Sequence, residues 1–339
     1  LLGSIPMIGA WAASKWMIPW ADKVGGVSSA GYKGVTQGWW ALGAVLGSFF
    51  GAQIAAWLGR HAAGREVELR DLSGALGKID IQGPAAARIL APLLEDASVL
   101  SDMVYFSFKG RPDDDSTVRL KTGEPLLLSR SGYTGEFGFE IFLAPEATPG
   151  LWQALLETGR ELGLLPCGLA ARDSLRAGAV LPLSHQDIGG WKFLGHPWPF
   201  ALPWNADQTA FTKDFVGKAA LAAGPDRYTL PFVGADPRKV GTEQARVLDD
   251  TGRGIGTVLT CTTDMGITLL DGRIVSVTTP GLPADLKFRG LVCGFVLVDR
   301  LLAPGTRVIL AEGARSIPVT IVTDVRPDRS ARKAMKNFL

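Results

Sequence analysis

Two glutamates, Glu136 and Glu140, lie four residues apart near the end of the run Ser-Gly-Tyr-Thr-Gly-Glu-Phe-Gly-Phe-Glu at residues 131–140. If residues 136–141 are extended, both carboxylates share one face of a strand and the apolar residues between them share the other. Gly138 lies between the carboxylates and has no side chain to keep a flat ligand away. This spacing predicts a carboxylate-bearing binding face; the alternative is that both glutamates lie in solvent or in ion pairs.

Two arginines form a second candidate group in the run Gly-Leu-Ala-Ala-Arg-Asp-Ser-Leu-Arg at residues 168–176. Arg172 and Arg176 are four residues apart, so they share one face of a helix that is predicted to begin near Leu169. Cations on an inner helix face need anionic partners. The spacing alone leaves open whether these partners belong to a ligand or to the protein, and Arg176 could be a member of a structural ion pair; Asp173 is adjacent in sequence to Arg172.

The histidines and cysteines indicate no metal site. His185 and His196 lie eleven residues apart in an irregular Gly-, Pro- and Trp-rich loop. They could carry protons near neutral pH or be structural, and the spacing supplies no third metal ligand. Cys167, Cys261 and Cys293 form no Cys-x-x-Cys pair, so neither a disulfide framework nor a zinc site is predicted.

Composition indicates a folded protein of two or three domains. The chain has 339 residues, of which 47% are hydrophobic and 20% charged. Its net charge of +2 comes from dispersed basic residues, so nucleic acid is not expected as a partner.

Residues 65–224 carry the pattern of an α+β domain, and residues 225–339 that of a small β-barrel or sandwich. A strand is predicted at Gly77–Gln82, followed by a helix that starts at Gly83-Pro84 and runs to about Leu94. A second helix is predicted from Thr148 to Gly163. Further strands are predicted at residues 104–108, 118–121, 126–130, 228–232, 245–248, 254–260, 291–298, 307–310 and 317–322.

Residues 1–64 differ from the rest because they are strongly apolar. The run 36–58 has no charged side chain and, as a helix, would span roughly 30 Å, the thickness of a bilayer core. Residues 1–20 form a second, interrupted apolar stretch. We expect N-terminal apolar helices that tether the chain to a membrane through residues 1–60, with residues 65–339 in the cytoplasm; the alternative is a buried core hairpin.

The order and spacing of the motifs at residues 131–140, 168–176 and Leu202-Pro-Trp204 resemble those of one family. This is the glycine-cleavage T-protein (aminomethyltransferase) family, which includes tetrahydrofolate-dependent demethylases. The resemblance covers residues 66–339. Residues 38–60 instead resemble the second transmembrane helix of a major-facilitator transporter, which suggests a tether, a fusion or a foreign fragment.

The T-protein resemblance implies a ferredoxin-like folate-binding domain, a C-terminal β-barrel and tetrahydrofolate as cofactor. It aligns Glu140 with a glutamate that hydrogen-bonds the pterin, which suits a carboxylate because it can accept two parallel hydrogen bonds. It aligns Arg172 with an arginine near the folate and Trp204 with an aromatic residue packed beside it. Tyr133, in the same motif as Glu140, is a further candidate contact, and Glu136 is expected to support the turn.

The implied reaction is attack of the folate N5 amine on an activated carbon. The donor would be an aminomethyl group on a lipoylated carrier protein or, in a demethylase, a methyl group on a small molecule. A folate-binding or regulatory relative without turnover is a third reading, and a transporter a fourth.

The catalytic residue is unassigned by the sequence. In the family an aspartate in an Asp-Asp-Leu-like run precedes the region that residues 72–84 resemble, and no equivalent aspartate is found here. An incomplete folate pocket with little turnover is therefore expected. Glu136 and Asp187 are the nearest candidates to replace that aspartate.

Overall fold

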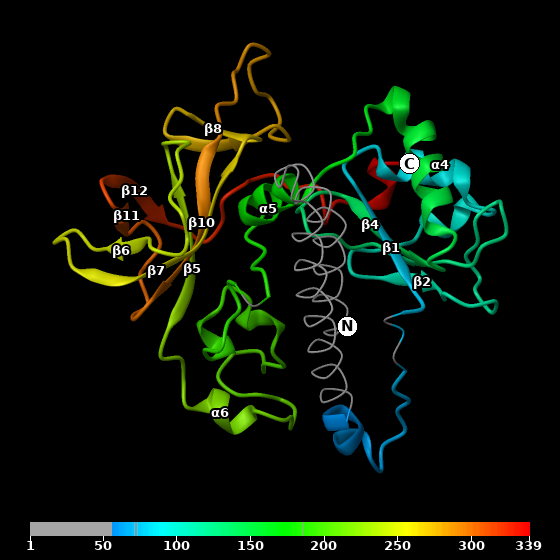
Figure 1. Ribbon diagram of the computed structural model, residues 1–339, viewed down its shortest axis with the longest axis horizontal. Coiled ribbons are helices and arrows are strands. Elements are labelled where there is room, and N and C mark those ends of the chain that lie inside the picture. The colour runs from blue at the N-terminus through cyan, green and yellow to red at the C-terminus, as the bar shows by residue number, and fades with distance from the viewer. Residues whose placement is uncertain (1–55, 71, 73, 185) are drawn as a thin grey trace, which may run out of the picture. The chain divides into compact units, whose positions relative to one another are not determined.

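The computed structural model describes residues 56–70, 72, 74–184 and 186–339 (Figure 1). The chain divides into two compact units, one of residues 1–77 with 144–146 and one of residues 78–143 with 147–339. In the first unit, residues 56–62 are helical. The predicted N-terminal apolar helices, including all but the last three residues of the run 36–58, lie outside the described residues. Within the described residues, no helix combines the length and the apolar character needed to cross a bilayer.

The α+β part of the second unit is built on a four-stranded sheet in the order β1-β4-β3-β2. Its strands are β1 (Gly77–Gln82), β2 (Phe108–Gly110), β3 (Leu127–Ser129) and β4 (Gly138–Leu143). The β3–β4 pairing is antiparallel and sets Ser129 opposite Glu140. The predicted strand at residues 77–82 is confirmed.

The core of this sheet is apolar. Phe139 and Ile141 of β4 and Phe137 just before it are fully buried, as the alternation predicted. They pack in one cluster with Leu90 of α3 (Ala86–Leu90) and Leu155 of α4 (Thr148–Gly159). Burial of these apolar side chains stabilises the sheet.

Of the predicted helices, only the one expected from residue 83 to about residue 94 differs in the structure. Instead of one helix to Leu94, α3 is five residues long and is followed by 3₁₀ turns at Ala91–Leu93 and Ala97–Leu100. Pro92 explains this, because its ring cannot continue an α-helix. The helix α4 continues as a 3₁₀ turn at Arg160–Leu162 and stops at Gly163, whose φ of +76° suits glycine, as predicted.

Two predicted strands in this part are wrong. Residues 104–107 are not a strand: Phe106 has φ +64°, outside the extended region, and Val104 is 65% exposed. Pairing begins only at Phe108. Residues 118–121 contribute isolated bridges, Leu94 to Leu120 and Arg119 to Pro125.

The C-terminal part is a closed six-stranded barrel in the order β10-β5-β12-β11-β6-β7, which confirms the predicted barrel. Its apolar side chains converge inside, and all eight residues of β10 are buried. A hairpin of β8 (Ile267–Leu270) and β9 (Arg273–Ser276) was not predicted. The barrel strands are β5 (Tyr228–Gly234), β6 (Arg246–Leu248), β7 (Gly254–Asp264), β10 (Leu291–Val298), β11 (Arg307–Glu312) and β12 (Arg315–Ile321).

Between sheet and barrel lie α5 (Leu169–Gly178), 3₁₀ turns at Phe193–Gly195 and Pro199–Ala201, and α6 (Lys218–Ala222). After β12 the chain, red in Figure 1, ends with a 3₁₀ turn at Met335–Asn337. Met335 and Phe338 join the core of the four-stranded sheet, where Phe338 stacks on Phe137 with ring centroids 3.9 Å apart.

Candidate functional site

Glu140 lies on β4 with its carboxylate held from two sides. Lys78 Nζ, from the neighbouring strand β1, donates to Oε1, and Ser131 Oγ donates to Oε2. Lys78 also forms an ion pair with Asp80 of β1, with 3.1 Å between Nζ and Oδ1. The Glu140 side chain keeps 21% of its surface exposed, so the carboxylate is partly accessible.

The charges around Glu140 favour its ionised form. Burial alone would raise the pKa of Glu140, but Lys78, the hydrogen bond from Ser131 and the charge of Arg172 together hold that pKa below its ordinary value. Asp80 behaves in the opposite way. Burial raises the pKa of Asp80, and the nearby cations only partly offset this effect.

Tyr133 and Arg172 lie together beside this group. The Tyr133 hydroxyl donates to the carbonyls of Leu181, at 3.2 Å, and Pro182, at 2.5 Å. Arg172, an exposed residue of α5, sets its guanidinium carbon 4.8 Å from the Tyr133 ring centroid, a cation–π contact. Burial raises the pKa of Tyr133, so the phenol stays protonated and acts as a donor. The structure thus brings Glu140, Arg172 and Tyr133 into one neighbourhood.

Trp204 is held within its own segment. Its Nε1 donates to the Pro199 carbonyl at 2.6 Å, and its ring lies 4.4 Å from that of Phe211, centroid to centroid. These contacts are those of a locally packed tryptophan. Its place beside a ligand stays a prediction.

Glu136 binds the C-terminal segment rather than the turn that it was expected to support. Arg326 Nη1 donates to Oε1 at 2.7 Å, and Ser330 Oγ donates to Oε2 at 2.5 Å. Because β4 begins at Gly138, Glu136 precedes the strand and does not share a ligand face with Glu140.

Gly138 does not leave room for a ligand, contrary to prediction. A β-carbon at this position would lie 2.3 Å from the Ile81 carbonyl oxygen and 2.7 Å from the side chain of Gln82. Strand β1 already fills that space. The glycine therefore permits close approach of β1 to β4.

Arg176 belongs to a buried ion pair, the structural alternative left open by the sequence. Its Nη1 bonds to Asp187 Oδ2, and its Nε donates to Asp173 Oδ1 at 2.7 Å. Asp187 also accepts from the Leu183 amide at 2.9 Å and from Thr260 Oγ1 at 2.7 Å.

Neither carboxylate named as a substitute for the family aspartate is available for that role. Both oxygens of Glu136 and both oxygens of Asp187 accept hydrogen bonds from within the chain. Moving either carboxylate to a substrate would break a largely buried charge pair, which is costly. The prediction that Glu136 or Asp187 replaces the aspartate is therefore not supported by their geometry.

His185 lies outside the described residues. His196 is buried and contacts the rings of Trp191 and Phe193, at 5.2 and 5.5 Å between centroids, and burial lowers its pKa. Within residues 56–339, apart from the three undescribed positions, no cluster of three or more His, Cys, Asp or Glu side chains is arranged for a metal ion.

Three polar neighbours of Glu140, Lys78, Asp80 and Ser131, were not predicted from the sequence. Lys78 and Asp80 alternate on β1 with the buried Ile79 and Ile81, so they occupy its polar face. The same period of two that predicted β1 could have indicated them. The contact between Lys78 and Glu140 depends on the pairing of β1 with β4, which the spacing within one strand does not show.

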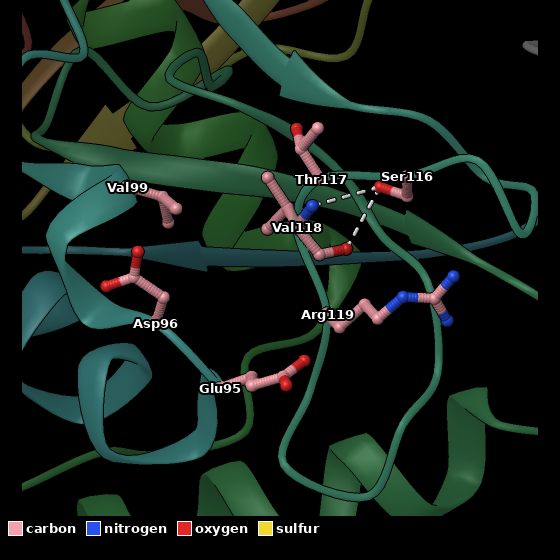
Figure 2. Close-up of a pocket in the computed structure, with 7 residues that line it drawn as sticks. All are labelled: Glu95, Asp96, Val99, Ser116, Thr117, Val118 and Arg119. Atoms are coloured by element: carbon pink, nitrogen blue, oxygen red, sulfur yellow. Dashed lines mark hydrogen bonds between the residues drawn. The ribbon is translucent and has the colours of Figure 1, made fainter.

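A surface hollow of about 400 Å³ lies elsewhere, between the 3₁₀ turn at residues 97–100 and the segment 116–119 (Figure 2). Ser116 Oγ bonds there to the amide and the carbonyl of Val118. None of the predicted folate contacts lines this hollow, whose lining residues are Glu95, Asp96, Val99, Ser116, Thr117, Val118 and Arg119.

Comparison with known proteins shows what the chain resembles. Residues 43–192 match the family described as the GCVT N-terminal domain, a match that starts inside the apolar run. The chain is 36% identical over 279 residues to the aminomethyltransferase of Saccharopolyspora erythraea, covering 80% of this chain and 65% of that protein. It is 40% identical over 261 residues to that of Streptomyces coelicolor (74% and 59%) and 39% identical over 177 residues to that of Anoxybacillus flavithermus (51% and 45%).

A solved structure shares the fold. The glycine cleavage system aminomethyltransferase T from Bartonella henselae superposes with a TM-score of 0.60 at 24% identity, covering 84% of this chain and 67% of that one. An α+β sheet joined to a six-stranded barrel is thus the T-protein fold. The chain is thus similar to the glycine-cleavage T-proteins, through its match to the GCVT N-terminal domain and its likeness to the aminomethyltransferases. The chain spans 45% to 65% of the length of the three aminomethyltransferases named above, and 42% of the length of a further one from Moorella thermoacetica. The resemblance of residues 1–64 to a transporter finds no support in these matches.

Proposed function

We propose that this chain binds tetrahydrofolate and serves in one-carbon transfer, as an aminomethyltransferase-like protein. The observation that carries the proposal is the Glu140 carboxylate, partly exposed and held in its ionised state beside Arg172 and Tyr133. The relatives named aminomethyltransferase support the same reading.

The donor and acceptor chemistry of the site fits a reduced pterin. A carboxylate offers about four lone-pair positions. Lys78 and Ser131 each occupy one position on separate oxygens of Glu140. One position therefore remains on each oxygen, enough for two parallel hydrogen bonds from an amino-pyrimidinone edge. The four-stranded sheet that holds Glu140 would be part of a ferredoxin-like folate-binding domain.

The other predicted contacts would orient the ligand. Arg172 would place its planar cation against an anionic or aromatic part of the folate, and Tyr133 would fix Arg172 through its ring. Trp204 would pack beside the ligand. When bound, tetrahydrofolate would supply the amine that accepts the carbon unit, and the chain's own contribution would be binding and orientation.

The carbon donor would be a lipoylated carrier protein that bears an aminomethyl group. A small methyl donor, as in a demethylase, is the alternative. We assign no catalytic residue, and we place this chemistry in the cytoplasm.

A folate-binding protein without turnover is the second candidate. Its support is the engagement of Glu136 and Asp187 in internal ion pairs, which leaves neither as a proton acceptor for the reaction.

The test is tetrahydrofolate titration by calorimetry on the chain, followed by a transfer assay. Saturable binding that weakens in Glu140→Ala supports the proposal. In the transfer assay, aminomethyl-loaded carrier protein is mixed with tetrahydrofolate and the methylene product is followed. Product above the uncatalysed rate favours the transferase, whereas binding without product favours the second candidate. No detectable tetrahydrofolate binding by a folded chain would overturn both.

A further inference from the structure

Lys78 lies between two carboxylates of different strands. It donates to Glu140 Oε1 on β4 and pairs with Asp80 Oδ1 on its own strand β1. The three side chains keep only 21–30% of their surface exposed. The Lys78 ammonium also lies 5.6 Å from the centroid of the Phe142 ring, which packs against it from β4.

These contacts fix Lys78 at both ends. Its stem extends from a paired strand, and its ammonium uses two of three donors on carboxylates. Asp80 pairs with the Lys78 ammonium and so limits where it can move. The ammonium bonds to Oε1 of Glu140, and the Ser131 hydroxyl bonds to Oε2. The plane of the Glu140 carboxylate is then defined before any ligand arrives.

We infer that Lys78, held by Asp80, is a positioning residue that fixes the Glu140 carboxylate as an anionic acceptor for a planar donor edge. The inference rests on the proposed function for the identity of the ligand, a reduced pterin. It assigns Lys78 no direct contact with that ligand.

The charged and titratable groups around Glu140 come from several elements. Lys78 and Asp80 lie on β1, Arg172 on α5 and Tyr105 in the segment before β2. Lys78 is the cation bonded directly to the Glu140 carboxylate, and Arg172 acts on it through charge alone. Removing Lys78 therefore leaves the carboxylate partly buried without its bonded cation, and protonation becomes easier.

Lys78→Met tests the inference because methionine keeps an unbranched apolar stem of similar length. Lys78→Arg restores the charge. Lys109→Met is the matched control, since Lys109 lies on β2 of the same sheet and forms an ion pair with Asp102. The Glu140 carboxyl is titrated by carbon-detected NMR, and tetrahydrofolate affinity is measured by calorimetry near neutral pH.

We expect Lys78→Met to raise the pH at which Glu140 protonates and to weaken tetrahydrofolate binding about tenfold, the loss typical of one charge-assisted contact. Lys78→Arg is expected to recover most of both effects, and Lys109→Met to alter neither. Should Lys78→Met fail to fold, Lys78→Gln gives a second measurement. It removes the same charge and keeps a polar end, and it should likewise raise the pH at which Glu140 protonates.

The inference is overturned if Lys78→Met leaves the Glu140 titration in place, or if it tightens tetrahydrofolate binding, which would make Lys78 a competitor of the ligand. An unchanged titration in Lys78→Gln has the same consequence. The NMR titration needs no ligand, so a wild-type chain that binds no tetrahydrofolate defeats the proposed function separately.

Discussion

Arg326 and Glu136, 190 residues apart in the sequence, form an ion pair with 2.7 Å between Nη1 and Oε1. The same guanidinium donates through Nη2 to the carbonyls of Thr134, at 2.7 Å, and Leu175, at 2.6 Å. Its Nε lies 3.1 Å from Asp264 Oδ2 on β7. One buried cation thus joins the segment before β4, the helix α5 and the barrel.

Removing either partner of this pair should destabilise the chain strongly. We expect Arg326→Met or Glu136→Gln to lower the free energy of unfolding by about 3–5 kcal/mol, because the remaining charge or polar group stays largely buried without its partner. Urea unfolding followed by circular dichroism measures the change. Arg329→Ala is the control, since its pair with Asp324 is more exposed and should contribute at most about 1 kcal/mol. Equal losses in Arg326→Met and Arg329→Ala would contradict the structural role.

A methyl group at Gly138 should separate β1 from β4. Gly138→Ala puts its β-carbon against the backbone carbonyl of Ile81, which cannot move without breaking strand pairing. We expect a loss of about 1–3 kcal/mol in unfolding free energy. Gly150→Ala in α4, where no atom lies within 4 Å, is expected to be neutral or slightly stabilising. If both variants unfold at the same urea concentration, β1 does not constrain this position.

Loss of the Glu140 carboxylate should weaken tetrahydrofolate binding. Glu140→Ala is expected to cost about 1.5–3 kcal/mol, or one to two decades in affinity, because a charge-assisted pair to the ligand is lost. Calorimetry measures the affinity, and circular dichroism checks the fold. The exposed Glu157 of α4 provides the control variant Glu157→Ala, which should bind like the wild type. An unchanged affinity in folded Glu140→Ala removes Glu140 from the site.

Arg172 should contribute through both its charge and its planar shape. Arg172→Ala is expected to weaken tetrahydrofolate binding by about one decade. Arg172→Lys should fall between this variant and the wild type, since lysine keeps the charge but not the planar group that lies over Tyr133. Fluorescence or calorimetric titration ranks the three proteins, with Arg160→Ala at the exposed end of α4 as control. The reverse order, or no order, would argue against the assignment of Arg172.

Buried His196 should make the chain less stable in mild acid. Burial lowers the pKa of His196 in the folded state, whereas the unfolded chain has the ordinary value near 6.5. Below pH 6.5 the unfolded state binds more protons than the folded one. The free energy of unfolding therefore decreases as the pH is lowered, until the folded-state pKa of His196 is reached. Urea midpoints between about pH 7 and pH 5 should therefore fall less steeply in His196→Gln than in the wild type. Equal slopes in the variant and the wild type would sink the prediction.

The sequence predicted elements whose signal is local. Strands β1 and β10 begin and end where alternation and apolar runs placed them. The strand expected at residues 104–108 failed because its apolar residues are exposed and Phe106 adopts positive φ, a conformation that side-chain type does not reveal. The β8–β9 hairpin carries too short a pattern to be distinguished from a turn.

The site was predicted in part for the same reason. The motifs at residues 131–140 and 168–176 predicted Glu140 and Arg172 as site residues. The structure brings the charges of these two side chains close enough to interact. The roles of Glu136 and Gly138 depend on partners far away in sequence, Arg326 and Ile81, which no local spacing indicates. The alternation within a strand shows which residues share a face, but it does not show which distant segment packs against that face.

The stacking of Phe338 on Phe137 has a consequence for synthesis of the protein. The sheet that carries Glu140 cannot complete its core until residue 338 has left the ribosome, because Met335 and Phe338 are part of that core. The nascent chain must therefore hold an open apolar surface on its first-made sheet while the whole barrel is translated. Chaperone binding during translation should concentrate on that surface and end when Met335 and Phe338 dock.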